Sequence, residues 1–477
     1  MKTTRRAMLK STAAVAATAS IPSVIRASTD SPNDTVQVAI IGLRGKGKQH
    51  MQMFKAMDGV RVAAICDPDR NILAERAKEL GDLQAKTHTD LRRVMDDKEL
   101  DAVVIATPNH WHALATIWAC QAGKDVYVEK PVSYTIEESR HMIAAARQYD
   151  RIVQSGTQRR SDPALAETFA ALRKGELGKI KQIRVCHYSV RGSIGKVKGA
   201  QAVPKHIDYE LWCGPAAKGP LMRKNLHYDW HWVWETGNGE LGNNGPHELD
   251  LARWVGGYET LAPGVVSVGG RFGWNDDGET PNTHLVYYDY QPAPIIMEVR
   301  NLPVKKGMRT ADHYKGIRTG IVVECEERYF AGMDGGHLYD KNGKKIRQIV
   351  GDGGRTHQAN FIAAVRSRKR ADLNAEIAVG HLSCGLCHQG NISHRLGNKT
   401  SIAEAREMRK ADAPNAAAFD RMAAHLDANE IDATSAQIHL GPMLRFDPVA
   451  ERFPGNEEAN ALLGRVYRTP FAWPGKI

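Results

Sequence analysis

Three glycines and one aspartate have the types and spacing that bind a dinucleotide. Gly42, Gly45 and Gly47 follow an apolar segment, and Asp67 comes 20 positions after Gly47. Glycines let a backbone approach a pyrophosphate at the start of a helix, and a carboxylate at this distance accepts hydrogen bonds from ribose hydroxyls. Arg44 stands where the usual G-x-G-x-x-G pattern has its middle glycine. We expect the pyrophosphate to lie on one backbone segment: Gly42, Leu43, Arg44, Gly45, Lys46 and Gly47.

The acidic residue also bears on the choice between NAD and NADP. The carboxylate of Asp67 would repel a 2′-phosphate, which favours NAD. Arg70, three positions later, is close enough to weaken that preference. We therefore expect NAD, with NADP as the less favoured alternative, and we assign both side chains to the cofactor site.

The elements that must position these residues are strands that alternate with helices. Apolar runs at 36–41, 60–66, 102–106 and 125–128 have the length of buried strands, and helical stretches separate them. This order predicts a parallel sheet with ligands at the carboxyl ends of its strands. Polar residues stand at those ends, and a further segment, 154–160, leaves the domain. The cofactor candidates from these places are Thr107, Pro108, Asn109, His110, His112, Glu129, Lys130 and Gln158.

Several of these segments together resemble one protein family. The glycine segment, ATPNHWH at 106–112, VEKP at 128–131 and GNNGPHELD at 242–250 resemble the markers of the Gfo/Idh/MocA family. The resemblance extends from about residue 36 to 397, and residues 440–474 are similar to the tail of its exported branch. It implies an α/β fold: a Rossmann domain, then an α+β domain with a large open, mostly antiparallel sheet. It also implies a homo-oligomer, a dimer or tetramer, formed through an exposed sheet face.

The resemblance implies hydride transfer at Lys130 and His247. A carbinol carbon would give hydride to the nicotinamide while His247 takes the hydroxyl proton and Lys130 holds the oxygen. The family often has Asp four positions before this histidine, where this sequence has Asn243. An asparagine orients a neighbour but relays no proton. The second acid/base therefore stays open among His227, Tyr228, His231 and His110.

The segment LHYDWHWVW at 226–234 favours a sugar as substrate. Aromatic faces pack against the C–H faces of sugars, and interleaved polar groups bind the hydroxyls. Two alternatives are core aromatics in a loop and a zinc site at His227 and His231, for which no third ligand is apparent. We predict no metal. The substrate-binding candidates are Arg159, Arg160, His227, Tyr228, Trp230, His231, Trp232 and Asn244.

The N-terminus has the pattern of a twin-arginine (Tat) signal. Arg5 and Arg6 precede an alanine-rich stretch, and we expect residues 1–27 to be removed; the alternative is a basic disordered tail. The Tat route exports folded proteins to the periplasm, which holds no free NAD pool. We therefore expect tightly bound NAD. An arm at 28–35 and the tail at 440–477 are expected to cover it.

Composition excludes several classes of protein. The 477 residues are 42% hydrophobic with a mean hydropathy of −0.43, which excludes a polytopic membrane protein. The net charge of +11 includes five basic and no acidic residues before Ser28. Without a basic block, we predict no nucleic-acid or membrane partner. Seven cysteines do not suggest a disulfide framework. Cys384 and Cys387 match a haem c pattern, but we favour buried helix thiols.

These observations predict three regions and leave three functions. The regions are a Rossmann domain at 36–155, a substrate-binding α+β domain at 156–400, and a helical region with a tail at 401–477. The favoured function is a sugar oxidoreductase with retained NAD(H). The alternatives are a redox-neutral NAD-dependent glycosidase, lyase or epimerase, which Asn243 and the aromatic segment mildly favour, and a non-catalytic sugar-binding protein. Lys130 and His247 argue against the last.

Overall fold

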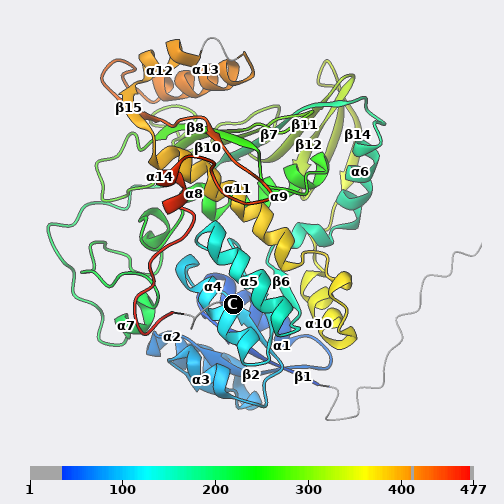
Figure 1. Ribbon diagram of the computed structural model, residues 1–477, viewed down its shortest axis with the longest axis vertical. Helices are drawn as coiled ribbons and strands as arrows, with labels where there is room; N and C mark the ends of the chain where they lie inside the picture. Colours follow the sequence, from blue (N-terminus) through cyan, green and yellow to red (C-terminus); the bar gives the residue numbers. More distant parts are fainter. Residues whose placement is uncertain (1–34, 410–412, 473–477) are drawn as a thin grey trace, which may run out of the picture. The chain divides into compact units, whose positions relative to one another are not determined.

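The structure is a computed structural model that describes residues 35–409 and 413–472 (Figure 1). The predicted signal at 1–27 and nearly all of the predicted arm lie outside the described residues. No helix in the described part of the chain has both the length and the apolar character that crossing a membrane requires.

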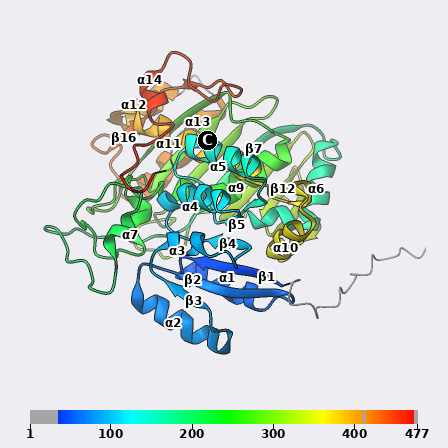
Figure 2. The ribbon, with the colours of Figure 1, turned by 60° about the horizontal axis from the view of Figure 1, so that its bottom comes forward.

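The first domain is the predicted parallel sheet. Its six strands run in the order β3-β2-β1-β4-β5-β6, and every neighbouring pair is parallel. The central strands are continuous apolar runs because helices cover both faces of the sheet (Figure 2). The strands are β1 Val36–Ile41, β2 Val60–Cys66, β3 Lys86–His88, β4 Ala102–Ile105, β5 Asp125–Val128 and β6 Val153–Ser155. The helices are α1 Gly45–Lys55, α2 Arg70–Leu80, α3 Leu91–Asp96, α4 Asn109–Gln121 and α5 Ile136–Gln148.

The second domain contains an eleven-stranded sheet in the order β14-β13-β12-β11-β7-β10-β9-β8-β16-β15, with β17 paired to β8. All pairs are antiparallel except β7 with β10, which confirms a mostly antiparallel sheet. Its strands are β7 Ile180–Tyr188, β8 Gly264–Gly270, β9 Thr283–Tyr288, β10 Ile295–Arg300, β11 Thr319–Cys325, β12 Arg328–Met333, β13 Gly335–Asp340, β14 Lys345–Val350, β15 Asn398–Ser401, β16 Gln437–Leu440 and β17 Leu444–Arg445.

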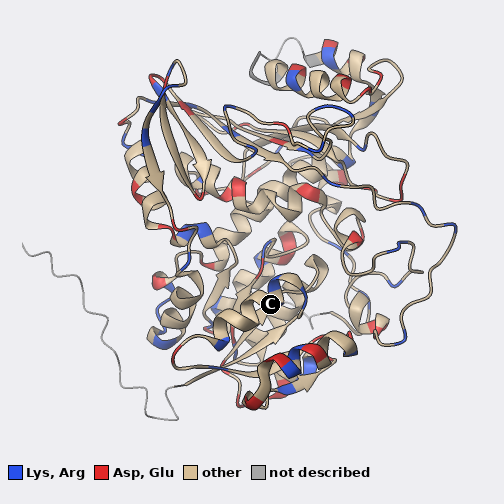
Figure 3. Cartoon of the chain, turned by 180° about the vertical axis from the view of Figure 1, so that it is seen from behind, with Lys and Arg blue, Asp and Glu red and all other residues tan. Residues whose placement is uncertain are grey.

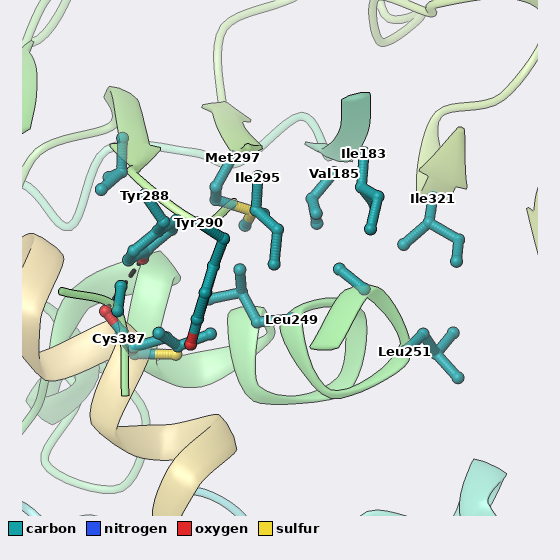
Figure 4. Close-up of a cluster of buried hydrophobic side chains, with 14 of the residues drawn as sticks. Ile183, Val185, Leu249, Leu251, Tyr288, Tyr290, Ile295, Met297, Ile321 and Cys387 are labelled. Atoms are coloured by element: carbon teal, nitrogen blue, oxygen red, sulfur yellow. Dashed lines mark hydrogen bonds between the residues drawn. The ribbon is translucent and has the colours of Figure 1, made fainter. Parts of the chain in front are cut away.

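Helices α6 Pro163–Arg173, α9 Gly245–Gly256 and α11 Ile377–Arg395 cover the inner face of this sheet. Figure 4 shows Leu249 and Leu251 of α9 facing the apolar side chains of β7, β10 and β11. Helix α11 also contacts the first domain, where the Cys384 thiol accepts a hydrogen bond from the Val132 N–H at 3.2 Å. Cys384 and Cys387 are buried within this helix, as the prediction of buried helix thiols requires. This packing fixes α9 against both domains.

The outer face of the sheet, which we expected to be exposed, is covered in part. Helices α12 Ile402–Arg409 and α13 Ala413–Ala428 lie across it (Figure 1), and Phe419 and Met422 pack on Leu285 and Ile296. Further along the sheet, the loop residue Tyr314 packs against a cluster from β11 and β12. The C-terminal region of this chain therefore covers part of the sheet face through which we expected the oligomer to form. The homo-oligomer stays a prediction, but an exposed sheet face no longer supports it.

A long connection between β7 and α8 Gly239–Asn243 reaches back to the first domain. We call residues 189–238 the cover segment. It contains α7 Tyr209–Cys213 and a short 3₁₀ turn at Asp229–Trp232. Its backbone pairs with the end of β2: Ile207 bridges Asp69, and the Asp208 N–H donates to the Pro68 carbonyl at 3.0 Å. The remaining elements are α10 His357–Ser367, α14 Glu457–Ala461 and 3₁₀ turns at Gly81–Leu83, Gln158–Ser161 and Arg370–Asp372.

The C-terminal tail packs onto the cover segment. The Arg468 guanidinium binds Glu210 and donates to the Gly214 carbonyl at 2.8 Å, and the Phe471 ring lies edge-on to Trp111 at 5.5 Å. The tail therefore holds the cover segment in place from outside.

Charges elsewhere on the chain are mixed, with basic and acidic residues interspersed (Figure 3).

Candidate functional site

A cavity of about 530 Å³ lies at the carboxyl ends of β1, β2, β4 and β5, beneath the cover segment. Of the residues predicted from the sequence, it is lined by Gly42, Leu43, Arg44, Gly45, Lys46, Asp67, Thr107, Pro108, Asn109, His112, Glu129, Lys130, His227, Tyr228, Trp230, His231 and Asn243. The structure thus brings the glycine segment, the lysine and the aromatic segment into one site.

The glycine segment has the close packing that a dinucleotide cradle needs. A Cβ on Gly42, where φ is +84°, would lie 2.6 Å from the Ala106 carbonyl oxygen. A Cβ on Gly47 would lie 1.7 Å from the Gly42 oxygen, whereas a Cβ on Gly45 would meet nothing within 4 Å. Gly47 therefore serves packing and does not line the cavity, while Gly45 leaves space above the helix start.

The start of α1 is suited to an anion. Arg44 occupies the N-cap position without a side-chain capping bond, and the first turn contains no acidic residue. The first N–H groups of the helix are thus not capped by a side chain, and Lys46 adds positive charge beside them. These residues fit the pyrophosphate of a dinucleotide.

Asp67 stands at the end of β2, where the adenosine ribose of a dinucleotide would lie. Its carboxylate accepts hydrogen bonds from the Leu43 N–H at 2.8 Å and the Asp69 N–H at 2.9 Å. Burial raises the pKa of Asp67 to about 6, against the lowering effect of these two bonds. An ionised carboxylate fixed at the end of β2 has lone pairs left for ribose hydroxyls, so the residues present fit NAD.

His227 lies near this end of the site and not beside Lys130. Its Nε2 is 3.1 Å from Asp69 Oδ2, and the Arg44 guanidinium binds the same oxygen at 2.9 Å. Burial and then the charge of Arg44 lower the pKa of His227 to about 4, so the imidazole is neutral. This position beside Asp69 does not agree with the prediction that His227 binds the substrate.

Arg70, unlike His227, does not line the cavity. Its guanidinium donates to the Lys205 carbonyl at 2.5 Å, and its N–H donates to the His206 carbonyl at 3.0 Å. The side chain therefore anchors the cover segment at the end of β2 and is occupied with that segment rather than with a 2′-phosphate.

Lys130 follows β5 and contacts the helix that precedes α9. Its ammonium donates a hydrogen bond to the Asn243 carbonyl oxygen. Burial lowers the pKa of Lys130, while the Glu129 carboxylate opposes the effect. Burial would raise the pKa of Glu129, but His50, 2.8 Å away, holds it at about 2. Lys130 is thus a partly desolvated cation that an ionised Glu129 keeps charged.

His247 lies in the first turn of α9 and is only 8% exposed. Its Nδ1 is buried and has no hydrogen-bond partner in the described part of the chain. Burial, followed by the positive charges of Lys130 and Arg159, lowers its pKa well below the ordinary value. The imidazole is therefore neutral and can accept a proton, although its side chain does not line the cavity itself.

Behind these groups lies a charged network that the sequence did not reveal. The fully buried Glu240 of α8 binds Arg191 at 2.9 and 3.0 Å and accepts from the Asn243 amide at 3.3 Å. His187 lies between two carboxylates, with Nδ1 2.9 Å from Glu248 and Nε2 3.3 Å from Glu240. Burial alone would lower the pKa of His187, but these carboxylates raise it to about 9. A protonated His187 and Arg191 in turn keep Glu240 ionised.

The aromatic segment divides between the site and the core. The Trp230 and His231 rings stack at 3.7 Å in the cavity wall, and the Tyr228 hydroxyl accepts a hydrogen bond from Arg191 at 3.2 Å. Burial lowers the pKa of His231 to about 4. Trp232, assigned to the substrate, is 5% exposed and does not line the cavity. The segment is thus partly the core loop that we weighed as an alternative.

Other predicted residues have structural partners instead. The His110 ring nitrogens lie 3.0 Å from the Trp212 carbonyl and 3.3 Å from the Thr236 carbonyl, so His110 holds the cover segment and does not line the site. Arg160 forms two bonds with Asp250 of α9, at 2.8 and 2.9 Å, and stacks on Trp254.

The last three predicted site residues also have side chains outside the cavity lining: Gln158, Arg159 and Asn244. Arg159 pairs with Asp334 at 2.7 Å. Gln158 begins the 3₁₀ turn after β6. The Asn244 amide donates to Glu240. The described part of the tail, 440–472, also contributes no lining residue, so it does not cover the nucleotide site directly as we had expected.

Comparison with known proteins places this architecture in a family. Residues 36–157 match the Gfo/Idh/MocA model described as an oxidoreductase family with an NAD-binding Rossmann fold. Residues 190–419 match the model of the C-terminal alpha/beta domain of the same family. The inositol 2-dehydrogenase of Salmonella typhimurium is 29% identical over 182 residues, which are 37% of this chain and 53% of that protein. Inositol 2-dehydrogenase 2 of Saccharopolyspora erythraea is 33% identical over 229 residues, 48% of this chain and 56% of the relative.

The chain thus aligns with about half the length of these curated relatives. Among solved structures, the WlbA dehydrogenase of Bordetella pertussis, in complex with NADH and UDP-GlcNAcA, has a TM-score of 0.57 at 18% identity. That likeness covers 76% of this chain and 97% of the other, and it shows the fold. The two family models together span most of the chain, and the protein belongs to the Gfo/Idh/MocA oxidoreductase family.

Proposed function

We propose that this protein transfers hydride between a CH–OH group of a sugar or cyclic polyol and NAD that stays bound. The observation that carries the proposal is one cavity that is lined both by a dinucleotide cradle and by Lys130 and Asn243. The relatives named inositol dehydrogenase and levoglucosan dehydrogenase support a ring with several hydroxyls as substrate.

The residues of this chain account for the proton and the charge. His247 does not line the cavity in this structure. It is neutral, and it would accept the proton of the reacting hydroxyl, as the C–O bond becomes a carbonyl, once the bound substrate reaches its imidazole. The Lys130 ammonium donates to the same oxygen and stabilises its developing negative charge. When bound, the nicotinamide supplies the hydride acceptor. Asn243 orients Lys130 through its carbonyl oxygen, and Glu240 keeps the asparagine amide in place.

The carboxylates at the end of β2 support NAD rather than NADP as the cofactor. Asp67 and Asp69 carry two carboxylates at this position, and Arg70 is engaged with the cover segment. A 2′-phosphate would meet these negative charges with only Arg44, itself paired with Asp69, to balance them.

The cover segment and its anchors support the proposed retention of the cofactor. The segment is tied to the first domain by backbone pairs at Asp69 and Asp208, and from outside by Arg468. Release of a nucleotide from beneath it requires these contacts to open. Together with the twin-arginine pattern, this favours export of a loaded enzyme to a periplasm without free NAD. Nanomolar binding, about −12 kcal/mol, would be sufficient for the cofactor to survive dilution.

A second function is favoured by the additional acid/base groups in the same cavity. Tyr228 and His231 line the same cavity as Lys130, and Arg191 donates to the Tyr228 hydroxyl. A redox-neutral glycosidase, lyase or epimerase needs such a group to remove the C–H proton next to a transient ketone.

A homo-oligomer remains part of the proposal. Light scattering of the purified protein measures the oligomeric state.

Native mass spectrometry of the exported protein tests cofactor retention, with the released nucleotide identified enzymatically. Incubation with myo-inositol, levoglucosan and a panel of glycosides, scored for bound NADH, keto product and released reducing sugar, then separates the two functions. A dehydrogenase gives keto product with bound NADH; a glycosidase gives reducing sugar with no net NADH. A protein that emerges without nucleotide and turns over only with added NAD would refute retention.

A further inference from the structure

A second cavity, of about 490 Å³, lies between the C-terminal tail, α11 and the end of the cover segment. It shares no lining residue with the cavity described above. Asn238 stands between the two, since its side chain accepts from Asn109 at 2.9 Å and donates to the Tyr134 carbonyl at 3.0 Å. Nothing in the proposed hydride transfer uses this second cavity.

One wall offers hydrogen-bond donors that lack an acceptor. The Arg465 side chain is 8% exposed, and its Nη2 binds Glu235 at 2.7 Å. Its Nε and Nη1 are buried and have no hydrogen-bond partner among the described residues. An unpaired buried guanidinium edge is costly, and an anion satisfies it better than a neutral group does.

Two lining residues on α11 have acceptors that lack a donor. Asn391 is 5% exposed; its amide N–H donates to the Asn238 carbonyl, and its Oδ1 has no partner in the described part of the chain. The neighbouring His388 is 4% exposed, is hydrogen-bonded to the Ser133 backbone, and has an unpartnered Nε2. Burial lowers the pKa of His388 to about 3, so this nitrogen carries no positive charge to repel a donor. Hydroxyl groups are the ligands that such acceptors bind.

Charge and ring faces complete the chemistry. Four basic residues and one acidic residue line the cavity: Lys218, Arg395, Arg465, Arg468 and Glu235. Arg395 forms no ion pair with another described residue and lies 5.5 Å over the Trp234 ring. Trp234 is the third tryptophan of the aromatic segment, and it lines this cavity instead of the first.

We propose that this cavity is a second binding site, for a sugar ring that carries an anionic group. The anion would lie at Arg465 and Arg395, the hydroxyls at Asn391 and His388, and a ring face against Trp234. A carboxylate and a phosphate would satisfy the arginines alike, and both are compared in the test. Neither group alone accounts for the free acceptors on α11, which require the hydroxyls.

Titration calorimetry on the full NAD-loaded chain tests the proposal, in a Lys130→Met background that prevents turnover. The probes are D-glucuronate, glucose 6-phosphate, glucose, acetate and inorganic phosphate at up to about 10 mM. We expect one or both charged sugars to bind at least tenfold more tightly than glucose and than the anion of the same charged group alone. Equal binding of glucose, equal binding of the bare anions, or no binding of either charged sugar would overturn the proposal.

Variants then assign the binding to this cavity. Arg465→Gln and Arg395→Gln should each weaken it by about tenfold, the loss expected for one charged hydrogen bond. Arg395 is exposed and unpaired, so Arg395→Gln leaves the fold intact even if Arg465→Gln loosens the tail. Arg406→Gln is the matched control, because it removes an equal charge from an exposed pair with Asp420 on α12 and α13. Unchanged affinity in Arg395→Gln and Arg465→Gln would place the binding elsewhere.

Discussion

Arg191 and Glu240 are joined by two hydrogen bonds, from Nε to Oε2 at 2.9 Å and from Nη2 to Oε1 at 3.0 Å. The pair connects the cover segment to α8, the helix whose last residue is Asn243. Glu240 also accepts from the Asn243 amide. The negative charge that Asn243 lacks is therefore present three residues earlier on the same helix, in contact with the Asn243 amide.

Glu240→Gln should slow the hydride step about tenfold or more without changing the affinity for NAD. The substitution leaves Arg191 and His187 without their shared carboxylate, so it should also reduce the free energy of unfolding by about 3–5 kcal/mol. Rapid-mixing absorbance of bound NADH and thermal unfolding measure the two effects. Because a loss of stability alone would also follow from a purely structural role, the deciding result is a lower kcat with unchanged KM. Glu326→Gln, which removes an exposed carboxylate paired with Lys181, is the control.

His247→Ala should leave NAD bound and slow the hydride step by about a hundredfold or more, the range for loss of a general base. Lys130→Met should act similarly through the loss of charge stabilisation at the reacting oxygen.

The pH dependence of the wild-type rate also tests His247. Since the pKa of His247 lies well below its ordinary value, the rate should begin to decrease only at a pH below 6.5. Near-normal turnover in His247→Ala would remove the histidine from the mechanism; exposed His313→Ala is the matched control.

The nucleotide domain could be predicted from the sequence because its information is local. Each strand is a continuous apolar run, and the functional residue comes directly after it, as Asp67 does after β2 and Glu129 after β5. In a parallel sheet the carboxyl ends lie at one edge, so the place of these residues follows from the strands alone.

The second half of the site could not be predicted in this way, because it depends on where loops return. His110 and Trp232 have suitable side chains, but tertiary contacts turn the first toward carbonyls of the cover segment and bury the second. Glu240 lies on one helix face with Asn243 and Asn244, and this i, i+3, i+4 spacing was a usable signal. Its partners His187 and Arg191 lie about 50 positions upstream, and no spacing rule indicates them.

The affinity for NAD should fall as the pH decreases through about 6. In the proposed complex the ionised carboxylate of Asp67 would accept hydrogen bonds from the ribose hydroxyls, and burial raises its pKa from 3.8 to about 6. Between pH 8 and 6.5 the affinity should be constant, and below pH 6 it should fall by up to about tenfold per pH unit. In the protein without NAD, the raised pKa of Asp67 has the opposite effect on the folding stability. The stabilising contribution of Asp67 is present below pH 3.8, and it is lost as the pH rises to about 6.

Titrating the nucleotide-free protein with NAD at fixed ionic strength measures this dependence. Asp67→Asn should bind more weakly by about 1.5–3 kcal/mol at pH 8 and show a flat profile. It should also discriminate less against NADP, because the 2′-phosphate no longer meets a charge. A wild-type affinity that does not change between pH 7 and pH 5 would show that Asp67 does not hold the ribose.

Arg468→Ala should speed release of NAD although the side chain does not line the nucleotide cavity. Its guanidinium binds Glu210 and the Gly214 and Ala216 carbonyls, which belong to the part of the cover segment that precedes Asn225 and His227 in the cavity wall. Losing these bonds lowers the cost of opening the segment, and we expect about a tenfold faster dissociation, equivalent to about 1.4 kcal/mol. Trapping of released NAD by an excess of a second NAD-binding enzyme measures the rate. Arg452→Ala removes an exposed arginine of the same tail, paired only weakly with Glu457 at 3.7 Å, and should release NAD at the wild-type rate. Equal release from both variants would mean that the tail does not hold the cover segment closed.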